Sequence, residues 1–200
     1  MIPGNSELLK CPFCGEEKEV LTLLSGNTCN GQQWSDMKSI YPMLPKVSPI
    51  QKCPSCGKYY FTKDAEKRQG KAYSLEKGDL TYTQLKEAAV QFGDEISKED
   101  RFVLDLLLLW AYNDLYNRED VNITDAPAEE KAYIDTVLDR LVEREDIDNI
   151  MKAEFYREMG LFVYVPLLIS QLNIEDPFLR DVAKRIHDYA KCKKSIAFKI

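Results

Sequence analysis

Two short motifs contain the residue types that can hold a metal ion. The first, CPFCG, spans residues 11–15, and the second, CPSCG, spans residues 53–57. In each motif two thiols lie on a tight turn, and a glycine follows where such a turn needs a positive φ. Together the motifs supply four thiolates, which is enough to close a tetrahedral site around one soft divalent ion. The predicted metal ligands are Cys11, Cys14, Cys53 and Cys56.

We expect the ion to be a single structural zinc. Four protein ligands leave no open coordination position for water or substrate, so such a site supports a fold rather than a reaction. Rubredoxin-like iron uses the same cysteine spacing and is the alternative metal. The long interval between Cys14 and Cys53 predicts an inserted loop within the metal module.

The inserted loop contains a tryptophan among polar residues. Asn27, Trp34 and Asp36 form the predicted interaction loop, because an aromatic ring among Gly, Asn, Gln and Asp is typical of a recognition surface. The alternative is that Trp34 folds over the metal module and completes its core. We favour this second interpretation, because the module has little apolar volume of its own.

The sequence contains no motif that indicates catalysis. It has no glycine-rich phosphate loop, nucleophile elbow or paired-carboxylate motif. His187 is the sole histidine, and we interpret it as a surface or partly buried residue of a helix. Cys29 and Cys192 lie outside the two motifs and are interpreted as spectator thiols. We therefore expect the protein not to be an enzyme.

The first part of the chain is predicted to contain short strands around the metal. Prolines between residues 42 and 49 exclude a regular helix there, and Tyr59–Phe61 has the strong β preference of a short strand. The charged segment 64–78 is predicted to be a linker. The expected first domain is a zinc ribbon with an inserted loop, residues 1–72.

Residues 73–200 are predicted to form an all-α domain. Thr81 can cap one helix, and Ser97 with Asp100 resembles a capping box that opens a strongly apolar helix. A further helix is expected to start near Pro127. The predicted fold class is therefore α+β, with a small β zinc ribbon followed by an all-α, tetratricopeptide-like domain.

The term tetratricopeptide-like refers to a spacing near the end of the chain. Ala153 and Tyr156 stand where a first helix receives a second, Gly160 where the chain turns, and Pro177 where the hairpin ends. This is the pattern of one repeat of about 34 residues. The segment 177–191 is predicted to be a closing helix that covers the exposed face of the hairpin.

Charge and composition restrict the classes of partner. The chain has 44% hydrophobic and 30% charged residues, which is typical of a globular protein. Residues 1–72 carry ten Lys/Arg against seven Asp/Glu, whereas residues 73–200 carry seventeen against twenty-six. Four thiolates around a divalent ion would make the first part nearly neutral. Nucleic-acid binding, which usually requires a basic patch, is therefore not expected.

The sequence also predicts where the protein works. No segment has the length and apolar character of a membrane span, and no secretory leader opens the chain. We therefore expect a cytoplasmic protein without membrane contact. In that reducing compartment, paired cysteines bind metal more often than they form disulfides.

Several phrases of the sequence carry a resemblance to a family. They are CPFCG, SGNT, QQWSD, PMLP and CPSCGKYYF, then LLLWAYNDLY and KAEFYREMGLF. On these phrases, most of the chain resembles an uncharacterised group of bacterial proteins that look like an N-terminal zinc ribbon fused to a tetratricopeptide-like helical domain. The resemblance implies the same four cysteine ligands and brings no established activity.

The expected function is that of a non-enzymatic adaptor, in which a structural zinc ribbon is joined to a helical domain that docks a protein partner. A nucleic-acid-binding zinc ribbon with a helical recruitment domain is the first alternative. An enzyme acting through the loop around Trp34 and Asp36 is the second.

Overall fold

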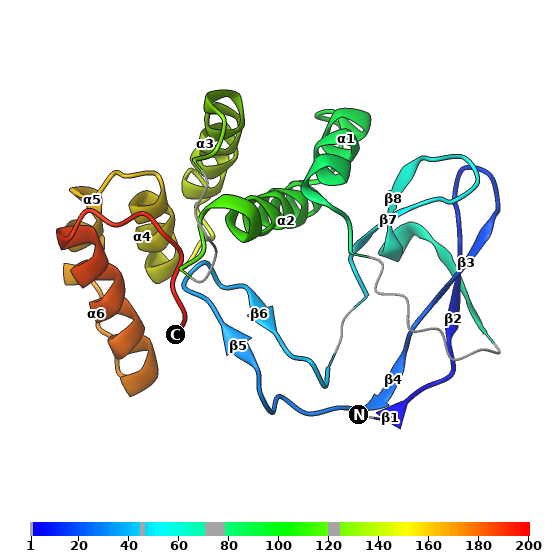
Figure 1. Cartoon of the computed structure of the whole chain (residues 1–200), viewed down its shortest axis with the longest axis horizontal. Helices are drawn as coiled ribbons and strands as arrows, with labels where there is room; N and C mark the ends of the chain where they lie inside the picture. Colours follow the sequence, from blue (N-terminus) through cyan, green and yellow to red (C-terminus); the bar gives the residue numbers. More distant parts are fainter. Residues whose placement is uncertain (1, 45–46, 71–78, 120–124) are drawn as a thin grey trace. The chain divides into compact units, whose positions relative to one another are not determined.

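The computed structural model has an α+β architecture. Short antiparallel strands occupy the N-terminal half, and α-helices follow them along the chain (Figure 1). The predicted fold class is therefore confirmed. The structure describes residues 2–44, 47–70, 79–119 and 125–200.

The chain forms two compact units. Unit 1 consists of Met1–Gly31 and Ile40–Leu104, and unit 2 consists of Gln32–Ser39 and Asp105–Ile200. Part of the inserted loop therefore belongs to the second unit. The predicted boundary after residue 72 lies outside the described residues and stays a prediction.

Two β-hairpins carry the cysteine motifs of unit 1. Strand β2 (Glu7–Lys10) pairs antiparallel with β3 (Glu17–Val20), and β7 (Ile50–Lys52) pairs antiparallel with β8 (Tyr59–Phe61). The predicted strand at Tyr59–Phe61 is confirmed, and all three of its side chains are buried. Its aromatic side chains provide the apolar surface that so short a strand needs to be stable.

Two further pairs of short strands lie among the described residues. Strand β1 (Ile2–Pro3) pairs with β4 (Leu23–Ser25), and β5 (Gln32–Gln33) pairs with β6 (Ser39–Ile40). The β5–β6 pair brackets the residues of the inserted loop that include Trp34 and Asp36.

The segment predicted to be a linker begins as regular structure. A 3-10 turn at Thr62–Asp64 leads into β9 (Glu66–Gln69), which pairs antiparallel with β2 at the side opposite β3. The linker prediction was wrong for Glu66–Gln69, because these residues form a strand that pairs with β2. All four side chains of β9 are exposed. A charged sequence suits such an edge strand as well as it suits a linker. Residues 71–78 lie outside the described residues.

Helix α1 (Tyr82–Phe92) starts at the predicted cap. The Thr81 hydroxyl accepts a hydrogen bond from the Gln84 backbone N–H at 3.3 Å, and the Gln84 side chain accepts one from the Thr81 N–H at 3.0 Å. This reciprocal pair is a capping box. It satisfies two of the N–H groups that a helix start leaves without an intrahelical partner.

The other end of α1 is fastened to β8. The Tyr59 N–H donates to Gln91 Oε1 at 2.9 Å, and Gln91 Nε2 donates to the Tyr59 carbonyl at 2.8 Å. The rings of Phe92 and Phe61 are stacked with centroids 4.9 Å apart. Helix α1 therefore covers the strand that follows the second cysteine motif.

Helix α2 (Lys98–Tyr116) also starts as predicted. The Ser97 hydroxyl accepts from the Asp100 N–H at 3.1 Å and donates to the Asp100 carboxylate at 2.8 Å. Its Leu104 and Leu108 side chains are fully buried. Among the described residues, no helix combines the length and the apolar character needed to cross a bilayer.

The later helices of unit 2 follow the predicted order. Helix α3 (Ala128–Val142) begins directly after Pro127, and α4 (Asn149–Glu158) is connected to α5 (Tyr164–Ser170) through a turn. The turn contains Gly160 with a φ of +75°, a conformation that glycine adopts at little cost. The expected helical hairpin is present, while its membership of the tetratricopeptide class stays a prediction.

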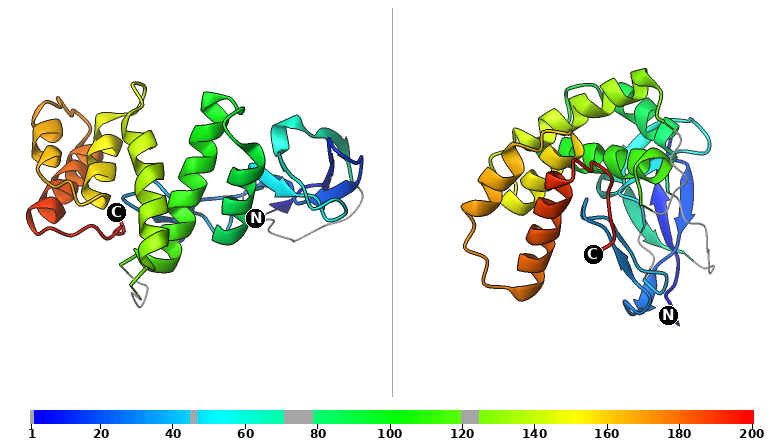
Figure 2. Two further views of the ribbon diagram at one scale, coloured as in Figure 1. Left: turned by 90° about the horizontal axis from the view of Figure 1, so that it is seen from above. Right: turned by 60° about the vertical axis from the view of Figure 1, so that its left-hand side comes forward.

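The predicted closing helix is confirmed. Helix α6 spans Pro177–Lys191, and the Asp176 side chain caps it by accepting from the Leu179 N–H at 2.9 Å. Helices α4, α5 and α6 lie against one another (Figure 2). The fully or largely buried residues of the core that they share are Ala153, Val165, Val182, Ile186, Ala190 and Phe198.

Candidate metal centre

Each cysteine motif forms the tip of a hairpin. The motif at 11–15 joins β2 to β3, and the motif at 53–57 joins β7 to β8. The N–H of the first cysteine donates to the carbonyl of the residue after the glycine, at 2.8 Å in the first motif and 2.9 Å in the second. The glycine N–H donates back to the carbonyl of the first cysteine, at 3.0 Å and 3.1 Å. The two motifs are therefore copies of one turn.

A glycine with positive φ closes each turn. Gly15 has a φ of +77° and Gly57 a φ of +72°. A Cβ atom built on Gly57 would meet no atom within 4 Å. The requirement for glycine thus comes from the backbone conformation, which disfavours a Cβ, and not from crowding.

The four sulfur atoms converge between the hairpin tips. All four lie within 4.8 Å of one another, with 3.8 Å between the sulfurs of Cys11 and Cys56 and 3.5 Å between those of Cys14 and Cys53. A tetrahedral ion with metal–sulfur bonds of about 2.3 Å separates its sulfur ligands by about 3.8 Å. The predicted ligands are thus placed together at a spacing that fits one metal ion, and both hairpins contribute to it.

The two positions of each motif differ in exposure. Cys11 and Cys53 are buried, while Cys14 and Cys56 are exposed. The two buried cysteines belong to a small core with Leu9, Val20, Tyr60 and Ala65. An ion held by all four would connect this core to the surface, where a chelator can reach it.

The thiols differ in how readily they ionise. Burial raises the pKa of Cys53, but the backbone N–H groups of Cys56 and Ser55 and the adjacent thiols outweigh it and lower that pKa to about 7. The Glu16 backbone N–H lowers the pKa of Cys14, whereas desolvation and the other three cysteines raise it to about 12. Neighbouring thiolates repel one another. A divalent cation offsets this repulsion between thiolates, because its positive charge lies close to all four ligands.

The structure separates the three residues of the predicted interaction loop. Asn27 is exposed and belongs to unit 1, where its side chain accepts from the Cys29 N–H at 3.0 Å. Trp34 and Asp36 belong to unit 2 and are 2% and 0% exposed. Our interpretation that Trp34 completes the core of the metal module was wrong, because that core does not include it.

Trp34 lies in unit 2 because its segment pairs with the C-terminal end of the chain. The Ser35 N–H donates to the Phe198 carbonyl at 2.9 Å, and the Phe198 N–H donates to Ser35 Oγ at 3.0 Å. The Ile200 N–H donates to the Gln33 carbonyl at 3.0 Å. The segment Gln32–Ser39 is therefore held by residues at the opposite end of the sequence.

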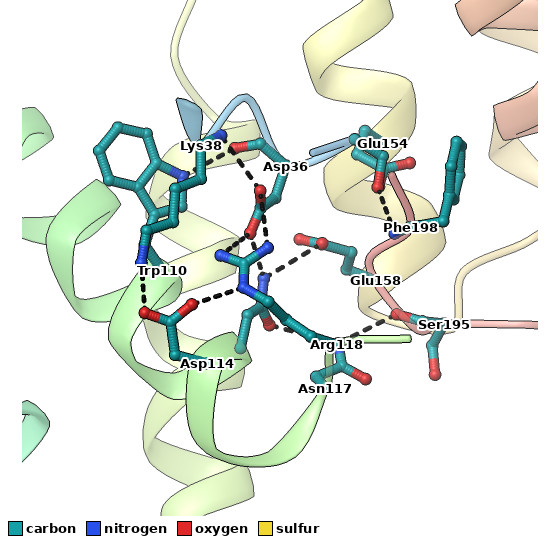
Figure 3. Close-up of polar contacts among 12 residues, drawn as sticks. Asp36, Lys38, Trp110, Asp114, Asn117, Arg118, Glu154, Glu158, Ser195 and Phe198 are labelled. Carbon is teal, nitrogen blue, oxygen red and sulfur yellow. Dashed lines mark hydrogen bonds and ion pairs between the residues drawn. The ribbon is translucent and has the colours of Figure 1, made fainter. Parts of the chain in front are cut away.

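Unit 2 also contains a buried polar cluster that the sequence analysis missed. We call Asp36, Asn113, Arg118 and Glu158 the Asp36 cluster. Figure 3 labels Asp36, Arg118 and Glu158. Asp36 Oδ2 accepts from Asn113 Nδ2 at 2.8 Å and lies 3.1 Å from Arg118 Nη2. Asn113 Nδ2 also donates to Glu158 Oε1 at 3.3 Å. The cluster links the inserted segment to α2 and α4.

A second buried ion pair lies beside this cluster. Arg157 Nε donates to Glu154 Oε2 at 2.7 Å, and both side chains are almost fully buried. Arg157 Nη1 donates to the carbonyl of Lys194. In the sequence, these residues could have been recognised by opposite charges at helical spacing. Asp114 precedes Arg118 by four residues, and Glu154 precedes Arg157 by three. Such spacing also occurs on solvated helix surfaces.

Comparison with known proteins does not assign the chain to a family. The resemblance to a bacterial zinc-ribbon group therefore stays a prediction. No protein-family model, curated protein or solved structure matched the chain.

Proposed function

We propose that the protein is a non-enzymatic cytoplasmic adaptor, in which a structural zinc ion holds unit 1 together and the helices of unit 2 dock a protein partner. The observation that carries the structural role is the set of four converging cysteine sulfurs, which fills a tetrahedral coordination sphere. A filled sphere leaves no position at which a substrate could be activated.

Zinc is the proposed ion because it takes four thiolate ligands in closed structural sites, and a structural ion is expected because the two hairpins share only a small core. The buried residues around the cysteines are few, and a module of this kind gains much of its folding free energy from the metal. Soft thiolate ligands also suit iron. Metal analysis of protein purified without added metal is expected to give about one zinc per chain. A red protein with visible thiolate-to-iron absorption would contradict the zinc proposal.

The proposal of a protein partner is supported by exposed apolar side chains on the helical hairpin and the following helix. Val163 is 77% exposed, Leu167 57% and Phe178 53%. Leu161, Tyr164 and Leu179 of the same segment are also exposed. Single exposed apolar residues are common, but a concentration in one short segment is typical of an interaction site.

A paired-variant capture experiment tests the docking role. The full chain and its Val163→Ser/Leu167→Ser variant are used as bait, and captured proteins are quantified by mass spectrometry. Val90→Ser is the matched control, because Val90 is 84% exposed on α1 in unit 1. We expect one protein to be retained by the wild type and the control and lost by the double variant. Equal capture by all three baits would contradict docking at this segment.

A further inference from the structure

The four cysteine sulfurs of unit 1 make two contacts between the hairpins. Cys14 Sγ lies 3.5 Å from Cys53 Sγ, and Cys11 Sγ lies 3.8 Å from Cys56 Sγ. Each of these pairs joins the motif at 11–15 to the motif at 53–57. The sulfurs are therefore arranged as two pairs that cross from one hairpin to the other.

Each pair contains one exposed and one buried thiol. Cys14 and Cys56 are exposed, whereas their partners Cys53 and Cys11 are buried. Oxidants attack cysteines that are accessible and have thiolate character, and metal-bound cysteine is a thiolate. A dissolved oxidant therefore reaches one sulfur of each pair, and the other sulfur lies next to it. This is the arrangement of a reactive thiol and its resolving thiol.

Protein contacts that involve no metal also join the two hairpins. Lys18 Nζ of β3 donates to Gln51 Oε1 of β7 at 2.8 Å, and Gln51 is fully buried. At the turns, the Lys58 ammonium lies 4.7 Å from the centroid of the Phe13 ring. The small core contains residues of both hairpins. These contacts favour the same juxtaposition of the two motifs without a bond to metal.

We propose that the cysteine cluster is a redox switch, in which a peroxide converts the four thiolates into the disulfides Cys14–Cys53 and Cys11–Cys56 and the metal ion is released. This inference rests on the structural metal site of the proposed function and concerns the regulation of that site.

The reaction balances with peroxide as the only oxidant. The exposed thiolate of a pair attacks one oxygen of hydrogen peroxide, the O–O bond breaks, and a sulfenic acid and a hydroxide ion form. The buried thiolate then attacks the sulfenic sulfur, forms the S–S bond and expels a second hydroxide ion. Each pair thus transfers two electrons to one peroxide molecule. A disulfide is neutral and no longer provides the thiolates that bind the metal.

Pairing between the motifs differs in its consequence from pairing within a motif. A disulfide between the hairpins replaces the link that the metal ion makes and constrains the unfolded chain. A disulfide within one motif closes only a local loop and leaves the hairpins unlinked. The oxidised protein is therefore expected to keep unit 1 folded without metal, and a thiol reductant with added zinc is expected to restore the loaded site.

The test uses the full-length, zinc-loaded Cys29→Ser/Cys192→Ser chain, in which the four cysteines of the cluster are the only ones left. Hydrogen peroxide is added, and released zinc is measured with a chromophoric chelator. The remaining thiols are alkylated, and the protein is digested with trypsin without reduction. Cleavage at lysine places each motif in its own peptide, residues 11–18 and residues 53–58.

We expect zinc release together with one species in which the two peptides are joined, and fragmentation of this species should pair Cys14 with Cys53. Separate peptides that each contain an internal disulfide would overturn the proposal. Retention of zinc, or zinc release with sulfinic and sulfonic acids but no disulfide, would overturn it as well.

Peroxide treatment in urea is the matched control. In the unfolded chain, closure within each motif is expected, because cysteines near in sequence meet most often. Equal disulfide patterns in folded and unfolded protein would show that the hairpins do not direct the pairing, against the proposal.

The same digestion of chelator-treated, metal-free protein distinguishes a failure of this proposal from a failure of the structural zinc. A chain that is purified without zinc contradicts the structural zinc. The peptide pattern after peroxide decides the pairing in either metal state.

Discussion

The guanidinium of Arg118 lies over the indole ring of Trp34, with 4.4 Å between its central carbon and the ring centroid. The same guanidinium forms an ion pair with Asp36 at 3.1 Å. One cation just after the end of α2 therefore holds two residues of the inserted segment, Trp34 through its ring and Asp36 through its charge. Both ends of the ion pair are almost fully buried. Arg118 also pairs with Asp114 through Nε at 2.5 Å, whereas Arg118 is the cation that compensates the buried charge of Asp36.

Arg118→Met is expected to destabilise unit 2 by about 3 to 5 kcal/mol, because Asp36 would stay buried without its cation. The measurement is urea unfolding followed by tryptophan fluorescence. Trp34 and Trp110 both belong to unit 2 and report on it alone.

Two controls accompany this variant. Asp36→Asn/Arg118→Met leaves no unpaired charge and is expected to recover part of the loss. Lys38→Met removes a more exposed ion pair with Asp114 and is expected to cost less than about 1 kcal/mol. A small effect of Arg118→Met would contradict the importance of the buried pair.

Cys53→Ser/Cys56→Ser is expected to abolish metal binding and to unfold the β-hairpins of unit 1, because two of the four ligands are removed. Helices α3 to α6 lie in unit 2 and are expected to persist, so most of the circular dichroism at 222 nm remains. Cys29→Ser is the control, since Cys29 is exposed and outside the cluster. Loss of all helicity would show that the two units unfold as one.

Gly57→Ala is expected to weaken metal binding by about 1 to 2 kcal/mol. Residue 57 has a φ of +72°, and this left-handed backbone conformation is less favourable for alanine than for glycine. Gly57→Asn is the matched comparison, because asparagine tolerates this conformation better. Zinc competition with a chromophoric chelator measures both variants. Equal losses would indicate that the added side chain, rather than the backbone, causes the effect.

Glu158→Gln is expected to change how the stability of unit 2 depends on pH. Burial raises the pKa of Glu158 well above its ordinary range, Glu154 and Asp36 raise it further, and Arg157 and Arg118 act in the opposite direction. The folded state therefore favours the protonated carboxyl group. This contribution to stability is complete below the ordinary carboxyl pKa and is lost as the pH rises through the raised value.

Glutamine has no proton to lose at this position. The free energy of unfolding of the variant is therefore expected to increase relative to wild type as the pH rises above the ordinary carboxyl pKa. Urea unfolding monitored by tryptophan fluorescence at several pH values provides the measurement, with Asp139→Asn as an exposed control. A pH-independent difference would show that Glu158 has the same ionisation in both states.

Features that depend on a few neighbouring residues could be predicted from the sequence. The turn of each cysteine motif is specified within five residues, and the Thr81 and Ser97 caps within four. The convergence of four sulfurs follows once two identical turns are recognised as halves of one site. Local geometry explains why the hairpin at Gly160 and the closing helix were also predicted correctly.

The contacts of the inserted segment could not be predicted in this way. Ser35 and Phe198 are 163 positions apart in the sequence, and no local pattern indicates that they pair. The charged residues of β9 have the composition of a linker, and only their pairing with β2 reveals a strand. Glu158 likewise resembles a surface glutamate until the packing around α4 is known.

The two hydrogen bonds between Gln91 and Tyr59 have a consequence for self-association. A two-stranded hairpin has open edges, and an open edge is a template to which a strand of another molecule can add. At Tyr59, the amide of Gln91 already occupies both the N–H and the carbonyl group. The Gln91 side chain of α1 thus takes the place of the backbone of an added strand and blocks intermolecular sheet growth at Tyr59, in a strand whose three residues are all aromatic.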